Sequence, residues 1–157
     1  MTQDQGIRMQ RVVVGVDGSE SSKTALAWAV RQAELTGAKV EAVTAWHYPV
    51  MINRAAWALV TPDDEAEFEA FFARDLSDSI AEVLNPASQV KVSSTVRRGN
   101  AVQVLLDAAD GADLLVVGSR GHGGFVEALL GSVAQHCVQH ATCPRRRHPR
   151  LAVRPTA

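Results

Sequence analysis

Short apolar runs alternate along the chain with longer segments in which apolar residues recur at helical spacing. The first run, RVVVGVDGS from Arg11, is rich in β-branched residues and stops at the turn residues Asp17-Gly18, which is typical of a buried strand in a parallel sheet. A helix is predicted to follow, capped by Ser19, Ser21 or Ser22 and stopped at Gly37. One strand is therefore followed by one helix.

The same alternation continues through the rest of the chain. Strands are predicted over 40–46, 90–96 and 114–118. Helices are predicted from Thr61-Pro62 onward, over 101–109 and over 132–140. Strands that alternate with helices at this spacing form right-handed βαβ crossovers. We therefore predict one doubly wound α/β domain, with a parallel sheet and helices on both of its faces.

The helix predicted from Thr61 onward is long and acidic. Its apolar stripe, at four-residue spacing, consists of Phe68, Phe72, Leu76, Ile80 and then Val83 or Leu84. Eight acids and one base lie between Asp63 and Glu82, mostly on the other faces. We interpret this segment as a surface helix with a solvated acidic face.

The composition is that of an ordinary globular domain, with 157 residues, 46% of them apolar, and a net charge of −1. This charge is too balanced for non-specific nucleic-acid binding. No segment approaches the roughly 20 apolar residues of a membrane span, and residues 1–9, read as a flexible leader, lack the apolar core of a signal peptide. We therefore expect a cytoplasmic protein that binds neither nucleic acid nor membrane, in which Cys137 and Cys143 stay reduced.

In a doubly wound domain, ligands bind beyond the carboxyl ends of the strands where the strand order reverses. Here that rule indicates the end of the first strand, 15–17, and the end of the fourth strand, 118–121. Four glycines lie within the seven residues 118–124, and Gly131-Ser132 opens the next helix. Glycine amides and a helix start can hold phosphate oxygens, although such glycines can also simply form tight turns.

Two common nucleotide-binding signatures are missing. The chain has no GxxxxGK[ST] motif, and its first strand continues as GVDGS and not as GxGxxG. Both a P-loop NTPase and an ordinary dinucleotide dehydrogenase are therefore disfavoured.

Two segments, VVVGVDGSESSKTALAWA and ADLLVVGSRGHGGFVEALLGSV, resemble the universal stress protein family of the ATP-binding type. The family's ATP-binding pattern is Gly, two residues, Gly, nine residues, Gly, then Ser or Thr, and Gly118, Gly121, Gly131 and Ser132 fit it at every position. HATCP at 140–144 also resembles the family, so the resemblance defines a domain over residues 10–144.

The resemblance implies a five-stranded sheet in the order 3-2-1-4-5, of the adenine nucleotide alpha hydrolase-like type. It also implies a protein, commonly a homodimer, that binds ATP, with Mg²⁺ as an accompanying ion, more than it turns ATP over. By position, Asp17 would contact the ribose or adenine side, Gly15 and Val16 would line the pocket with backbone atoms, and Ala45 would meet the adenine edge. The residues implied around the phosphates are Gly118, Arg120, Gly121, Gly131, Ser132 and Val133.

The sequence departs from the family after residue 144. Residues 145–157 carry five arginines and no acid, where the family has a short apolar strand. Three consecutive arginines, 145–147, are not expected to form a buried strand, so the fifth strand and the usual dimer are doubtful here. We interpret residues 145–157 as a basic tail, with disorder as one interpretation of it.

The sequence gives weaker support for a metal site or a catalytic nucleophile. His136, Cys137, His140 and Cys143 could suggest zinc, but Cys137 points about 100° away from the face that the two histidines share. A buried cysteine and surface histidines fit better. Ser19 is better read as a helix cap than as a nucleophile. We assign no metal ligand and no catalytic residue.

Three functions follow as hypotheses. The first is an ATP-binding stress or signalling module. The second is a weak ATPase or self-phosphorylating enzyme, which lacks an evident general base and paired carboxylates for Mg²⁺. The third is an interaction protein of the same fold that binds no nucleotide.

Overall fold

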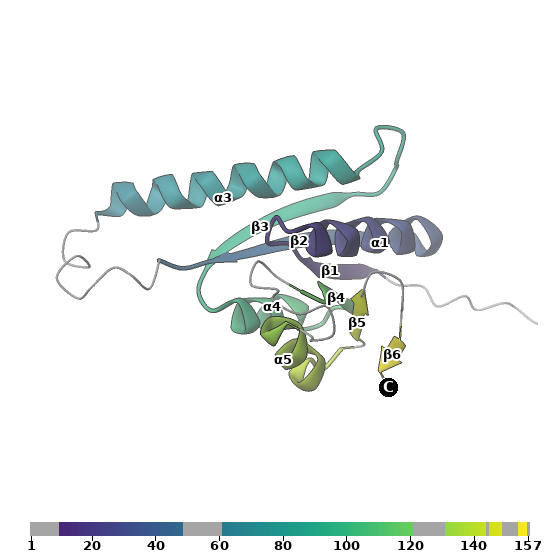
Figure 1. Cartoon of the computed structure of the whole chain (residues 1–157). Coiled ribbons are helices and arrows are strands. Elements are labelled where there is room, and N and C mark those ends of the chain that lie inside the picture. Colours follow the sequence, from purple (N-terminus) through teal and green to yellow (C-terminus); the bar gives the residue numbers. More distant parts are fainter. Residues whose placement is uncertain (1–9, 49–60, 121–130, 144, 149–153, 157) are drawn as a thin grey trace, which may run out of the picture.

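The computed structural model describes residues 10–48, 61–120, 131–143, 145–148 and 154–156 (Figure 1). In chain order the elements are β1 (Arg11–Gly15), α1 (Glu20–Thr36), β2 (Lys39–Trp46), α3 (Pro62–Val83), β3 (Val92–Arg98), α4 (Ala101–Ala109), β4 (Leu114–Gly118), α5 (Ser132–His140), β5 (Arg145–His148) and β6 (Arg154–Thr156). The described strands form one six-stranded sheet in the order β3-β2-β1-β4-β5-β6, parallel except for β6. The predicted α/β fold and the strand order 3-2-1-4-5 are confirmed.

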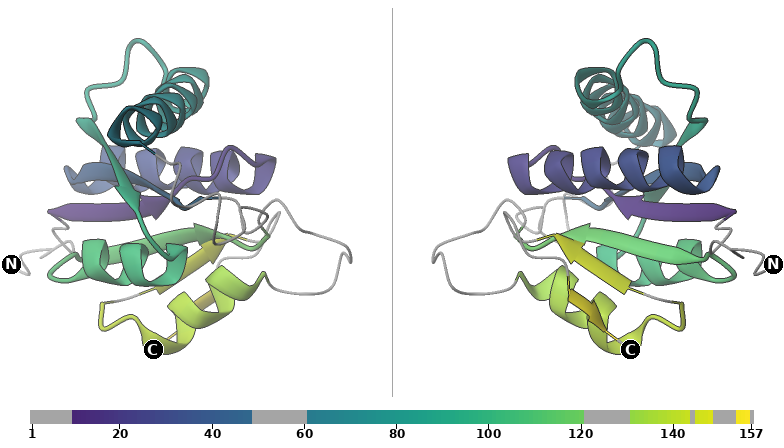
Figure 2. Two further views of the ribbon diagram at one scale, coloured as in Figure 1. Left: turned by 90° about the vertical axis from the view of Figure 1, so that its left-hand side faces the viewer. Right: turned by 90° about the vertical axis from the view of Figure 1, so that its right-hand side faces the viewer.

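Helices cover both faces of this sheet, as predicted. Helices α1 and α3 lie on one face, and α4 and α5 lie on the other (Figures 1 and 2). In β1, Val12 and Val14 pack with Leu26 under α1, whereas Val13 faces the opposite way and packs with Leu105 of α4. Alternate residues of a strand project to opposite faces, so a strand between two helical layers has to be apolar throughout.

The helix ends follow the signals in the sequence. The Ser19 side chain caps α1 by accepting a hydrogen bond from the Ser22 amide, and Gly37 ends the helix in the left-handed conformation with a φ of 75°. At the start of α3, Thr61 and Asp64 form a reciprocal capping box. The interpretation of Ser19 as a cap is therefore confirmed.

Helix α3 packs its predicted apolar stripe against the sheet and α1. Leu76 is fully buried, and the half-buried rings of Phe68 and Phe72 stack on Trp46 of β2 at centroid distances of 5.9 and 6.0 Å. Phe71, outside the stripe, is 60% exposed. The acidic residues of α3 are mostly exposed, as expected for a solvated face. Across the described residues, no helix has both the length and the apolar character needed to cross a membrane.

The backbone at Arg145–His148 takes the place of the family's fifth strand, whose apolar sequence is missing here, as expected. It lies parallel to β4, in a register from Arg145 opposite Leu115 to His148 opposite Gly118. Strand pairing uses backbone N–H and C=O groups, which arginine supplies as well as valine does, and charged residues are common near sheet edges. Beside the four strands β1 to β4, the place of a fifth strand is therefore taken by arginines and not by a buried apolar run.

Candidate functional site

The two strand ends singled out from the sequence lie side by side. Strands β1 and β4 pair in parallel, with Val14 opposite Val116, so both strands end at the same edge of the sheet. The chain continues there into Val16 and Asp17 after β1, and into Ser119 after β4. The strand order reverses between these two strands, which makes this edge the expected place for a ligand.

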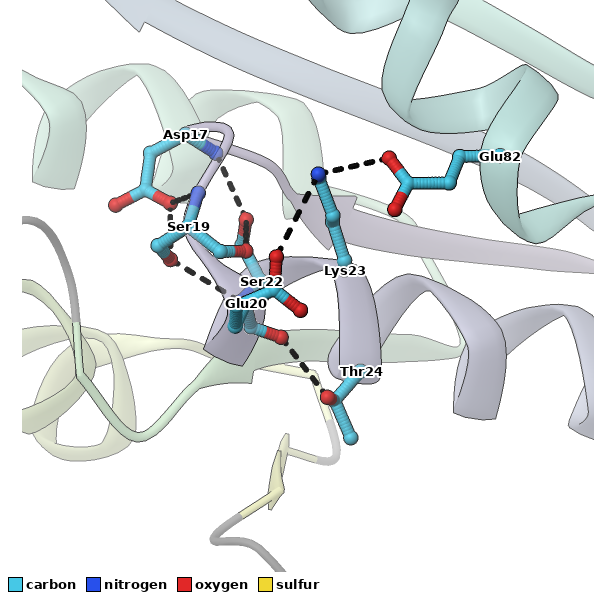
Figure 3. Close-up of polar contacts among 7 residues, drawn as sticks. All are labelled: Asp17, Ser19, Glu20, Ser22, Lys23, Thr24 and Glu82. Atoms are coloured by element: carbon cyan, nitrogen blue, oxygen red, sulfur yellow. Dashed lines mark hydrogen bonds and ion pairs between the residues drawn. The ribbon is translucent and has the colours of Figure 1, made fainter.

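Asp17 forms the turn between β1 and α1 (Figure 3). Its Oδ1 accepts hydrogen bonds from the Ser19 amide at 3.0 Å and from the Ser19 hydroxyl at 2.5 Å. The Asp17 amide in turn donates to Ser22 Oγ at 3.2 Å. Gly18, which lies between Asp17 and Ser19, has a φ of 81°, a conformation that favours glycine. The exposed carboxylate predicted at the nucleoside side therefore also holds this turn.

Helix α3 reaches the same turn through acidic side chains. A Cβ at Gly18 would lie 2.8 Å from Asp75 Oδ2, so this carboxylate lies directly against the turn. Lys23 of α1 pairs with Glu82 of α3 at 2.7 Å and with Glu20 at 3.6 Å (Figure 3). The hydrogen bond with Glu82 is the main cause of a raised pKa of Lys23. These contacts hold α3 beside the start of α1.

The backbone between β1 and β2 is fixed by hydrogen bonds. The Val16 amide donates to the Val43 carbonyl at 2.9 Å, and Thr44 Oγ1 donates to the Val16 carbonyl at 2.7 Å. A Cβ at Gly15 would approach a leucine methyl group of α4 to 3.0 Å. Ala45 follows Thr44 in β2 and is half-buried against the core beneath α4 and α5. Of the residues in this paragraph, the resemblance assigns Gly15, Val16 and Ala45 to the nucleoside end.

At Gly118 the end of β4 lies close against α1. A Cβ at this position would lie 2.7 Å from Ser21 Oγ and 2.9 Å from the Ser21 carbonyl carbon. Two residues later, the Arg120 amide donates a hydrogen bond to Ser21 Oγ at 3.3 Å. The glycine therefore allows a close approach to α1, a role distinct from that of a turn residue.

The end of β4 is also joined to the start of α5. The Gly131 amide donates to the Ser119 carbonyl at 2.7 Å. Residues 118–120 and 131–133, two parts of the predicted phosphate loop, are thereby brought together. Gly121, the second glycine of the ATP-binding pattern, lies outside the described residues.

The start of α5 differs from the starts of α1, α3 and α4. Those three helices are capped by the side chains of Ser19, Thr61 and Asn100, whereas Gly131 at the N-cap of α5 provides no side-chain hydrogen bond. Ser132 is exposed and Val133 is half-buried at this start. Their N–H groups belong to the first turn, where no intrahelical acceptor exists, so they and the positive end of the helix dipole suit an anion.

The histidine and cysteine cluster of α5 is split between the surface and the core. His136 and His140 are exposed with their ring centroids 6.3 Å apart. Cys137, on the same helix, is buried in the core that α4 and α5 form with the sheet. Burial raises the pKa of the Cys137 thiol to about 11, so it stays protonated at neutral pH. In the part of the chain that the structure describes, no group of three or more His, Cys, Asp or Glu residues could hold a metal ion.

Two residues of this site were not identified from the sequence. The sequence pattern indicates Ser21 only as a helix cap, and Asp75 only as part of a solvated acidic face. Both contact a glycine distant in sequence, Gly118 and Gly18 respectively. A hydroxyl in the first turn of the helix after the switch-point strand is the signal that could have indicated Ser21.

The chain is similar to proteins of one known family. The model of the universal stress protein family matches residues 9–145. Universal stress protein Rv2624c of Mycobacterium tuberculosis is 30% identical over 136 residues, which cover 87% of this chain and 47% of that protein. The chain thus spans about half the length of the curated relatives that it matches.

Solved structures show the same fold. A universal stress protein in complex with cAMP is 26% identical, with a TM-score of 0.62, and the match covers 90% of this chain and 97% of that chain. A universal stress protein family protein from Arabidopsis thaliana with AMP bound is 21% identical, with a TM-score of 0.54 and coverages of 88% and 90%. Because the family model matches most of this chain, the chain belongs to the universal stress protein family.

Proposed function

We propose that this chain binds ATP and acts as a nucleotide-dependent module in stress response or signalling, without fast chemistry of its own. The junction of β4 and α5 is the observation that carries this proposal. The hydrogen bond from the Gly131 amide to the Ser119 carbonyl holds the uncapped start of α5 beside the end of β4, where its N–H groups can meet phosphate oxygens. The relatives solved with cAMP and with AMP support an adenine nucleotide as the ligand class.

The proposed residues form two groups. Gly15, Val16, Asp17 and Ala45 are proposed for the nucleoside, and Gly118, Arg120, Gly121, Gly131, Ser132 and Val133 for the phosphates. The hydrogen bonds refine the second group, because the amides of Arg120 and Gly131 already donate to protein oxygens. Arg120 would therefore contribute its guanidinium, and Ser132 and Val133 their amides. Mg²⁺ would accompany the triphosphate.

The cellular setting is part of the same proposal. We place the protein in the cytoplasm, where adenine nucleotides are abundant. For the assembly we propose the homodimer that the family resemblance implies, against the doubt raised by the arginines at 145–147. Sedimentation velocity checks the assembly, and a single monomeric species would contradict it.

Isothermal titration with Mg-ATP tests the binding proposal. Adenosine and GTP serve as comparison ligands, and chromatography of the denatured protein identifies any nucleotide that co-purifies. Micromolar binding of ATP, or a co-purified adenine nucleotide, is the expected result. Folded protein that gives no heat with ATP, gains no thermal stability from it and carries no nucleotide would overturn the proposal and favour an interaction protein.

Hydrolysis is tested separately. Phosphate release is measured for the wild-type chain and for Gly118→Ala, in which the new Cβ would collide with Ser21. We expect no release above background in either protein. Steady release that the substitution abolishes would show that the chain is an ATPase, whereas release that persists in the variant would indicate a contaminating enzyme.

A further inference from the structure

We infer that Ser21 is a positioning residue for the phosphate side of the proposed nucleotide site. Its hydroxyl oxygen accepts a hydrogen bond of 3.3 Å from the Arg120 amide, 99 residues later in the chain. Ser21 lies in the first turn of α1, and Arg120 follows the end of β4. The contact ties the segment that leaves β4 to the helix that follows β1. Its importance for binding rests on the proposed function.

The packing of Gly118 against the same serine supports this role. A Cβ at Gly118 would lie 2.7 Å from Ser21 Oγ, 2.9 Å from the Ser21 carbonyl carbon and 3.0 Å from the Ser21 carbonyl oxygen. Because the two backbone segments are closely packed, a side chain at position 118 would force one of them to move. Because position 118 is glycine, the end of β4 comes near enough to α1 for the Arg120 amide to reach Ser21. A hydrogen bond and a close backbone approach thus converge on one residue.

The Ser21 hydroxyl is not needed to cap α1, because Ser19 and Ser22 form the hydrogen bonds at the start of this helix. Ser19 Oγ accepts from the Ser22 amide at 3.2 Å, and Ser22 Oγ donates to the Ser19 carbonyl at 2.9 Å. Ser22 Oγ also accepts from the Asp17 amide at 3.2 Å (Figure 3). Two consecutive serines therefore hold two different strand ends: Ser22 holds the end of β1, and Ser21 holds the end of β4.

This division predicts a selective effect. Loss of the Ser21 hydroxyl leaves the Arg120 amide without this acceptor and removes the hydrogen bond that ties Arg120 to α1. The nucleoside end would be unaffected, because Asp17 is held by Ser22. We therefore expect Ser21 to matter for ligands that carry phosphates and not for adenosine.

Isothermal titration with ATP and with adenosine, on the wild-type chain and on Ser21→Ala, tests this selectivity. Loss of one hydrogen bond of ordinary strength predicts an ATP affinity about twofold to tenfold weaker, with adenosine affinity unchanged and a melting temperature lowered by about a few degrees. Thr24→Ala is the matched control, because the exposed Thr24 hydroxyl donates within α1 to the Glu20 carbonyl. Unchanged ATP affinity in Ser21→Ala, or an equal loss for adenosine, would overturn the inference.

Amide hydrogen exchange tests the same role without a ligand. In Ser21→Ala, the Arg120 amide should exchange about twofold to tenfold faster, whereas the Gly131 amide, bonded to Ser119, should keep its rate. An unchanged Arg120 rate would refute the positioning role even if the wild-type chain bound no ATP. Failure of ATP binding in the wild-type chain, with faster Arg120 exchange in the variant, would instead refute only the proposed function.

Discussion

The carboxylate of Asp113 accepts a hydrogen bond of 2.8 Å from the backbone amide of Arg11, although 102 residues separate them in the chain. The same oxygen accepts a second hydrogen bond of 2.9 Å from the Gln10 amide. Asp113 directly precedes β4, and Arg11 begins β1, so this carboxylate joins the two strands at the edge opposite the proposed nucleotide site.

These amides lower the pKa of Asp113, the Arg11 amide most strongly. A lowered folded-state pKa stabilises the protein above the ordinary aspartate pKa of about 3.9, and this contribution is lost as the pH falls through the folded-state value. Asp113→Ala should therefore cost about 1 kcal/mol at neutral pH, a hydrogen-bond value discounted for solvent exposure. The cost should shrink below about pH 4. Urea unfolding at neutral and acidic pH measures it.

Asp107→Ala is the control for this prediction. The exposed Asp107 carboxylate accepts a hydrogen bond from Gln103 within its own helix and joins no strands. It should show a smaller effect at neutral pH. An effect of Asp113→Ala that is the same at every pH would mean that the charge of the carboxylate contributes nothing.

Gly118→Ala should destabilise the protein by about 1–3 kcal/mol and weaken ATP binding, because the new methyl group would collide with the backbone of Ser21. Gly15→Ala is the comparison. Its Cβ would meet the ends of the Leu105 side chain at 3.0 and 3.1 Å, which can move more easily. Chemical denaturation of both variants checks the order, and equal losses would contradict the close approach at Gly118.

Substitutions of Asp17 separate its two roles. Asp17→Asn keeps an oxygen that can accept from Ser19 and so should preserve the turn, whereas Asp17→Ala removes that oxygen and should cost about 1 kcal/mol. If the carboxylate also contacts the ribose, both variants should weaken adenosine and ATP binding but leave free triphosphate binding unchanged. Equal losses for all three ligands would make Asp17 a turn residue alone.

Helix α3 offers a test of its assigned core face. Leu76 is 1% exposed, so Leu76→Ala should lower the free energy of unfolding by about 2–5 kcal/mol. Phe71→Ala, on the same helix, removes a ring that is 60% exposed and should cost less than about 1 kcal/mol. Urea denaturation measures both. The reverse order would show that α3 packs with a different face.

The elements could be predicted closely from the sequence because their signals are local. The helix over 101–109, the strand over 114–118 and the helix over 132–140 have the predicted bounds. Ser19 and Gly37 act as the cap and the stop that their residue types suggest. The buried β-branched runs and their alternation with helices also specify the parallel sheet and, through it, the edge where a ligand is expected.

Pairings between distant segments could not be predicted from local pattern. A hydroxyl in the first turn of α1 could point to Ser21, but nothing near it in the chain identifies Arg120 as its partner. Likewise, nothing near Asp75 indicates that it lies against Gly18. The arginines at 145–147 carry no strand pattern, yet their backbone pairs with β4.

The sequence by itself determined the elements from β1 to α5, the ends of α1 and the family, because these depend on residue type and spacing within a few turns. Tertiary structure alone decided which hydroxyls and carboxylates hold the two strand ends together. Those contacts depend on packing between segments about 100 residues apart, as between Ser21 and Arg120, and short-range pattern carries no record of that packing.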